Sequence, residues 1–133
     1  MKTNKYFIIS AGVVISFILF PGCKKQDNKC ISHTTAVVTQ VTGPNTALVN
    51  QEIDLTVLYY LGNSCGQFEK LEATSNGNTT IISLKAKYLG CICADILLSG
   101  QANYKFKASQ AGVYFLNFLQ PNQTYFTDTI TVN

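Results

Sequence analysis

The stretch EIDLTVLYYL, residues 52–61, decides the fold class of this chain. Every second residue from Ile53 to Tyr59 is apolar. The first two positions between these apolar residues are polar, Asp54 and Thr56. Successive side chains of a β-strand point to opposite faces, so an alternation with period two predicts a strand with one buried face. The residues expected on that face are Ile53, Leu55, Val57 and Tyr59.

Residues rich in Thr, Val, Ile, Tyr and Phe continue from residue 34 to the end of the chain, with Asn, Gly and Pro at turn positions between them. This composition predicts strands rather than helices. The further strands expected are residues 36–41, 67–74, 79–89, 104–108, 113–119 and 125–132, with a short one at 95–99. Asn76-Gly77 predicts a tight hairpin before residues 79–89, because both residues tolerate positive φ. The fold class is therefore all-β, a β-sandwich of about seven strands.

The N-terminal segment has a different character. An apolar run between Lys5 and Pro21 is shorter than the ~20 residues that a membrane-spanning helix needs. Its basic start, apolar middle and small Gly22 form the three regions of a secretory signal. With FILFPGCKK at residues 17–25, the segment resembles bacterial lipoprotein precursors, and the resemblance implies that Cys23 receives the lipid, acyl chains such as palmitate. An ordinary cleaved signal, with Cys23 as a spare thiol, is the alternative.

Three segments follow from this interpretation: a lipoprotein signal peptide at residues 1–22, a lipidated N-terminus and linker at 23–33, and one domain at 34–133. After cleavage, eight of the ten Lys remain against seven Asp and Glu, scattered along the chain. A nucleic-acid partner would need a concentrated basic surface, so none is expected. The expected partners are the membrane, through the N-terminal lipid, and an unknown protein or glycan ligand.

The stretch QAGVYFLNF, residues 110–118, resembles the turn into the F strand of immunoglobulin-like domains. The resemblance implies that the hydroxyl of Tyr114 ties the strand start to upstream backbone, and that Gly112 forms the turn. Leu116 stands where an antibody domain carries its second inter-sheet cysteine, and the chain has no Trp. The fold expected is thus an immunoglobulin-like β-sandwich without the antibody core. In the alternative interpretation, Gly112 is an ordinary turn residue and Tyr114 a core aromatic.

Four of the five cysteines remain if Cys23 carries lipid, and an even number in an exported chain predicts disulfides. Cys91 and Cys93 stand two apart in LGCICAD, residues 89–95. On one strand both side chains would point to the same face, which does not suit a bond between them, so each should have a distant partner.

Hairpin register suggests which partner each has. If the turn is centred near Asn76-Gly77, Cys65 falls opposite Tyr88, close to Cys91. The favoured bonds are Cys65 with Cys91 and Cys30 with Cys93. The exchanged pairing stays open.

A thiol-based metal or redox protein is the competing function. Cys30-Ile-Ser-His33 is a C-x-x-H motif, and with the other three cysteines it could form a tetrahedral zinc site. Thiolate coordination is not reliable in an exported chain, so no metal and no cofactor are expected, and His33 should face solvent near the linker. A redox role is weaker still, because the motif is C-x-C without a helix that would lower the pKa of a thiol.

Catalytic constellations are not recognisable in the sequence. There is one His, no G-x-S-x-G motif, and the seven acidic residues are dispersed. The chain is therefore not expected to be an enzyme, and no catalytic residue is assigned.

Across residues 17–133 the chain resembles small uncharacterised lipoproteins of Bacteroidetes. The resemblance rests on the lipobox, an early Cys, SCGQF, GNTT, a GCIC motif and the final Gly-x-Tyr strand, with Lys and Asn common and Arg absent. It extends the expected fold and location only: a domain lipid-anchored in the cell envelope at the outer membrane, with the membrane face left open. The function expected from the residues themselves is a non-catalytic binding or structural module of unknown ligand. Around Thr129, Asp-Thr-Ile resembles the O-glycosylation acceptor of such proteins, although a Thr-rich closing strand is the simpler interpretation.

Overall fold

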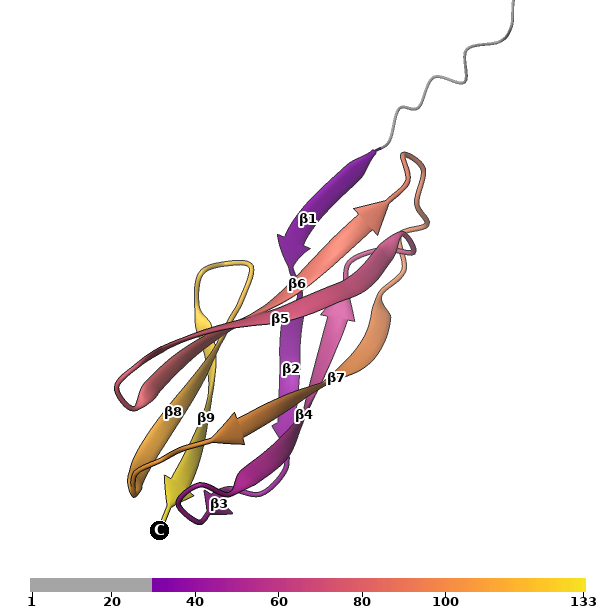
Figure 1. Cartoon of the computed structure of the whole chain (residues 1–133). Helices are drawn as coiled ribbons and strands as arrows, with labels where there is room; N and C mark the ends of the chain where they lie inside the picture. The colour runs from indigo at the N-terminus through magenta and orange to yellow at the C-terminus, as the bar shows by residue number, and fades with distance from the viewer. Residues whose placement is uncertain (1–29) are drawn as a thin grey trace, which may run out of the picture.

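Nine strands and no helix make up residues 30–133, the part of the chain that the computed structural model describes (Figure 1). The strands are β1 (Ile31–Thr35), β2 (Val37–Thr42), β3 (Thr46–Ala47), β4 (Glu52–Leu61), β5 (Gly66–Asn76), β6 (Thr79–Leu89), β7 (Leu98–Lys107), β8 (Gly112–Leu119) and β9 (Tyr125–Val132). They form two sheets, so the expected all-β sandwich is confirmed.

The smaller sheet has the order β2-β4-β7 and is antiparallel throughout. The larger sheet runs β1-β6-β8-β9-β3, and β5 pairs with β6 in addition. Strand β5 accompanies β6 along one edge, from Gly66 opposite Tyr88 to Asn76 opposite Thr79. On the other edge, β8 pairs with residues 79–82 and β1 with residues 85–89 of β6. Strand β6 therefore lies between β5 and β8 at its N-terminal end and between β5 and β1 at its C-terminal end.

The core lies between the two sheets and follows from the alternation in the sequence. Every second residue of β4 from Ile53 is buried, and Leu55 and Val57 are fully so. Leu84 of β6 and Leu116 of β8 are also fully buried, and they contribute to the core from the larger sheet. The largest fully buried side chains are Phe118, Leu55, Ile82, Leu84, Leu116, Ile130 and Val57. The buried face predicted for residues 52–59 is confirmed.

Several element boundaries differ from those expected. Strands β4, β6 and β9 have the predicted bounds, but β7 begins at Leu98 and takes in only the last two residues of the short strand expected at 95–99. The structure adds β1 and the two-residue β3, which pairs in parallel with β9. Because β1 begins at Ile31, the folded domain starts before residue 34, and the segment expected to be linker provides a strand.

The stretch LGCICAD was expected to be strand, and this was wrong. Strand β6 ends at Leu89, and residues 90–97 form an irregular loop. Gly90 has φ +140°, and a Cβ there would lie 2.9 Å from the sulfur of Cys65, so the position requires glycine. The chain turns at Gly90 and leaves the sheet.

Residues 30–133 contain no helix long and apolar enough to cross a membrane. The predicted signal peptide at residues 1–22 and the predicted lipid site at Cys23 lie outside the described residues.

Candidate functional site

The cysteines predicted to pair are gathered at one end of the sandwich. Two disulfides join the β6–β7 loop to the residues that precede β1 and β5. The Cα atoms of Cys30 and Cys91 are 5.0 Å apart, and those of Cys65 and Cys93 are 5.5 Å apart. Both distances lie within the range that a disulfide spans without backbone movement. All four cysteines are thus bonded, as expected, but the favoured pairing was wrong and the exchanged one is present.

Register on both edges of β6 explains the observed pairing. Ile31 lies opposite Leu89 on one edge, and the Gly90 amide donates to the Cys30 carbonyl at 2.9 Å, so Cys91 comes next to Cys30. On the other edge Asn76 pairs with Thr79, so the hairpin turns at Gly77-Asn78 and not at the predicted Asn76-Gly77, and a bulge between Phe68 and Lys70 moves the register back by only one residue. Tyr88 therefore pairs with Gly66 rather than with Cys65. The prediction considered only the hairpin of residues 67–89. It did not include β1, whose pairing with β6 places Cys30 next to Cys91.

Hydrogen bonds restrain the β6–β7 loop in addition to its two disulfides. The Ser64 amide donates to the Ala94 carbonyl at 3.0 Å, and the Ala94 amide donates to the Ser64 hydroxyl at 2.8 Å. The Cys65 sulfur lies 3.8 Å from the Ile92 carbonyl. An irregular loop held in this way has a defined backbone path and few conformations to lose on binding.

The zinc alternative does not agree with this arrangement. Zinc would need thiolates, whereas the sulfurs of Cys30, Cys65, Cys91 and Cys93 are bonded to one another. Within residues 30–133, no group of three or more His, Cys, Asp and Glu is placed to hold a metal ion. His33, the remaining proposed ligand, lies on β1 and is not part of the linker; its imidazole contacts Glu69 instead.

The corner expected at residues 110–118 is present. The Tyr114 hydroxyl donates to the Gln110 carbonyl at 2.9 Å, which ties the start of β8 to the backbone four residues upstream. Its ring packs edge-on against Phe106, with centroids 5.5 Å apart. Gly112 has φ +152°, a conformation that a side chain disfavours. These contacts give Tyr114 a structural role in orienting β8.

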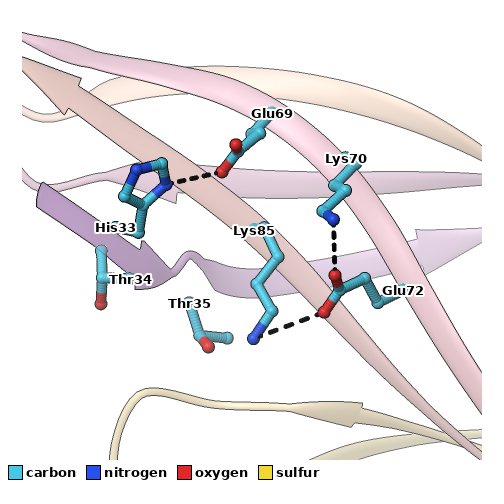
Figure 2. A pocket seen from close by; sticks show the side chains of 7 residues that line it. All are labelled: His33, Thr34, Thr35, Glu69, Lys70, Glu72 and Lys85. Carbon is cyan, nitrogen blue, oxygen red and sulfur yellow. Dashed lines mark hydrogen bonds and ion pairs between the residues drawn. The ribbon is translucent and has the colours of Figure 1, made fainter.

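A polar hollow of about 480 Å³ opens on the outer face of the larger sheet, across β1, β6 and β5 (Figure 2). Its lining residues are His33, Thr34, Thr35, Glu69, Lys70, Glu72 and Lys85. Lys85 faces outward because its neighbours Leu84 and Ala86 face the core. Strands β1 and β5 flank β6, so residues 36 or more apart in the sequence meet here.

Charges in this hollow are paired with one another. The His33 Nδ1 lies 2.9 Å from a Glu69 carboxylate oxygen. The Lys70 ammonium donates to Glu72 at 2.7 Å, and Lys85 approaches the other oxygen of the same carboxylate at 3.8 Å (Figure 2). The hydrogen bond from Lys70 lowers the pKa of Glu72, and the same bond raises the pKa of Lys70. Lys70 therefore stays protonated and Glu72 stays ionised at neutral pH.

This geometry leaves charged groups of both signs open to contact with a polar ligand. The side chains of Lys70 and Glu72 are 57% and 47% exposed, so water screens their interaction. The imidazole of His33 is oriented by a carboxylate, but its hydrogen bond is to no nucleophilic hydroxyl or thiol. Paired, exposed charges of both signs can exchange partners with a polar ligand.

Sequence reasoning did not single out the acidic and basic residues of the hollow. The mixed polarity of residues 67–74 is typical of an edge or a half-exposed strand, and among the described strands β5 pairs with β6 alone. Glu69, Lys70 and Glu72 were assigned only to that exposed edge. The charged side chains of residues 67–74 were a signal for a polar surface, but their partners on β1 and β6 depend on strand order.

Comparison with known protein families identifies a match that covers most of the sandwich. Residues 55–132, more than half of the 133-residue chain, match the family model described as the ORF11 beta-sandwich domain. No curated protein and no solved structure matches the chain. The matched range starts within β4 and includes the polar edge strand, the cysteine loop and the tyrosine corner.

Proposed function

The chain belongs to the ORF11 beta-sandwich domain family, and from this premise we propose that it is an exported, lipid-anchored, non-catalytic module of a bacterial cell envelope of the Bacteroidetes type. Its β-sandwich would stand at the outer membrane and make contacts with a protein or a glycan. Neither a nucleic acid nor a cofactor is part of this proposal.

The single observation that carries the proposal is the pairing of the cysteines. Four of the five form two disulfides within residues 30–133, and the fifth is Cys23. Structural disulfides persist in oxidising compartments, so they support export of the domain. Cys23 has no partner cysteine left in the chain, and it follows an apolar run that is too short to span a bilayer. Acylation of Cys23 accounts for both facts.

An anchor at Cys23 would also fit the architecture of the domain. The described chain starts at Cys30, which is bonded to the β6–β7 loop, so the sandwich is held firmly at the point where the N-terminal segment enters it. Two or more acyl chains hold a protein stably on a membrane, whereas a single myristoyl chain holds it only marginally. A multiply acylated Cys23 would therefore be a near-permanent tether.

The paired charges of the hollow support a binding or structural role rather than a chemical one. Glu69 and Glu72 alternate with Lys70 and Lys85 over a small exposed area. Such a surface favours a partner with polar groups of both kinds, as proteins and glycans have. Immunoglobulin-like sandwiches host many roles, so the contact surface and not the fold carries this point.

The test of the anchor is the variant Cys23→Ser, expressed in cells that process lipoproteins. We expect the full-length wild-type protein in the membrane fraction and Cys23→Ser in the soluble fraction. The matched control is Gln26→Ser, a change in the same segment that leaves the cysteine intact and should stay with the membrane. If Cys23→Ser remains membrane-bound and is cleaved at the same place, the proposed anchor is wrong.

The test of export is the thiol content of the purified, unreduced protein. An exported chain with two disulfides and an acylated Cys23 should show essentially no free thiol in an Ellman titration under denaturing conditions. Two or more free thiols per chain would contradict the proposal.

A further inference from the structure

Five apolar side chains are exposed at the cysteine end of the sandwich. The β6–β7 loop presents Ile92, which is 96% exposed, Leu97 at 71% and Ile96 at 52%. Beside them Ile31 and Leu89 are 43% and 39% exposed and lie opposite each other in the β1–β6 ladder. We call these five residues the apolar tip. Single exposed apolar residues are ordinary, but a group gathered at one end indicates an interaction site.

The backbone under the apolar tip is unusually well fixed for an irregular loop. Cys91 and Cys93 flank Ile92 and bond it to both neighbouring strand starts. The two disulfides restrict the path of the loop, and Ile92 is exposed to solvent in the domain. A side chain that is held outward by two covalent bonds pays little conformational entropy when a partner covers it.

The position of the chain's N-terminal segment indicates what that partner is. The segment enters the domain at Cys30, and Cys30 is disulfide-bonded to Cys91, next to Ile92. Only seven residue steps separate Cys23 from Cys30. A fully extended chain of that length spans at most about 25 Å. An acyl chain on Cys23 would therefore keep the apolar tip near the bilayer surface, and not the opposite end with β3 and the C-terminus (Figure 1).

The charge of the segment between Cys23 and Cys30 also favours contact with the bilayer surface. Residues 24–29 carry Lys24, Lys25 and Lys29 against Asp27. Basic residues next to a lipid anchor are attracted to anionic head groups, and this attraction adds to the burial of apolar area.

We propose that the apolar tip inserts at the boundary between the head groups and the acyl chains of the lipid bilayer and holds the β-sandwich in a fixed orientation on the membrane. This inference rests on the proposed lipid anchor at Cys23. The anchor gives the tip a high effective concentration at the bilayer, so five apolar side chains suffice for an interaction that would be weak in a freely diffusing protein. The polar hollow would then face sideways at a fixed distance from the membrane, because the domain could no longer rotate freely on its anchor.

The test uses a tryptophan placed at the tip. The natural chain contains no Trp, so Ile92→Trp introduces a single reporter at a position that is 96% exposed and tolerates a larger side chain. Leu97→Trp is a second reporter on the same loop. The matched control is Leu48→Trp, because Leu48 is 64% exposed and lies after β3, at the opposite end of the sandwich. The full, lipidated chain is reconstituted in vesicles of phosphatidylethanolamine and phosphatidylglycerol and recovered by flotation.

We expect the emission of Ile92→Trp in floated vesicles to shift to shorter wavelength than that of Leu48→Trp, and bromine-labelled acyl chains to quench it selectively. If the protein floats with the vesicles but Ile92→Trp and Leu48→Trp emit at the same wavelength and neither is quenched, the anchor is intact and the insertion of the tip is refuted. A shift without quenching would mean that a protein surface covers the tip, which also overturns it. Loss of flotation would refute the anchor itself and this inference with it.

Discussion

Replacement of Cys30 and Cys91 together by Ser should lower the free energy of unfolding by about 4 kcal/mol. Both residues are changed so that no unpaired thiol is left to exchange with Cys65–Cys93. The change removes the bond that ties the first described residue to the β6–β7 loop. Total stabilities of single domains are about 5–15 kcal/mol, so such a loss is large but leaves a folded state when the stability lies in the upper part of that range.

The magnitude follows from the length of chain that each disulfide closes. Cys30 and Cys91 are 61 residues apart in sequence, and Cys65 and Cys93 are 28 apart. In the chain-entropy account, the longer loop restricts the unfolded state by about 4.3 kcal/mol and the shorter by about 3.6 kcal/mol at 25 °C. Removal of Cys65 and Cys93 together should therefore cost about 0.7 kcal/mol less than removal of Cys30 and Cys91.

The assay is equilibrium unfolding in urea, followed by far-UV circular dichroism and by tyrosine emission, since the chain has no Trp. The two double variants serve as controls for each other. Hydrogen exchange adds a local readout: without Cys30–Cys91, the amides of β1 should lose protection before those of β4, because β1 is a five-residue strand at the end of its sheet.

Two results would refute this reasoning. A loss below about 1 kcal/mol for the Cys30 and Cys91 variant would mean that the bond does not restrict the unfolded chain as calculated. Peptide mapping of the unreduced protein that recovered Cys30 joined to Cys93 would mean that the register on the two edges of β6 is not the one that sets the pairing.

Three further substitutions test other parts of the domain. Tyr114→Phe should cost about 1 kcal/mol through loss of the hydrogen bond to the Gln110 carbonyl, and an equal cost for Tyr125→Phe, an exposed tyrosine, would contradict a special corner. Leu55→Ala should cost about 3 kcal/mol in urea unfolding because the side chain is fully buried between the sheets, and a cost under about 1 kcal/mol would contradict that placement. Glu72→Gln should make stability less sensitive to acid: the pKa of Glu72 is lowered in the folded state, so its contribution is present above its ordinary value of 4.5 and lost as the pH falls below it. Unchanged acid unfolding of Glu72→Gln would count against the pair with Lys70.

The strands of the core could be predicted because their signal is local. Alternation in residues 52–61 and 79–89 marks one buried face whatever the strands pair with, and both strands have the predicted bounds. The tyrosine corner is equally local, since Tyr114 bonds to a carbonyl only four residues upstream. The short strands β1 and β3 carry no such signal. Strand β1 exists through its pairing with β6, and most of its side chains are exposed.

The disulfide pairing and the polar hollow, in contrast, depend on which strands lie on each edge of β6. From the amino-acid sequence it could be predicted that Cys30, Cys65, Cys91 and Cys93 would pair, that residues 67–74 would form an edge or half-exposed strand and that a sandwich would form. Tertiary structure decided that β1 and β5 flank the same end of β6, so that Cys91 meets Cys30 on one edge and Cys93 meets Cys65 on the other. The physical reason is that side-chain alternation reports only the face that a residue occupies. Strand order and a one-residue bulge are set by long-range pairing and leave no periodic trace in the chain.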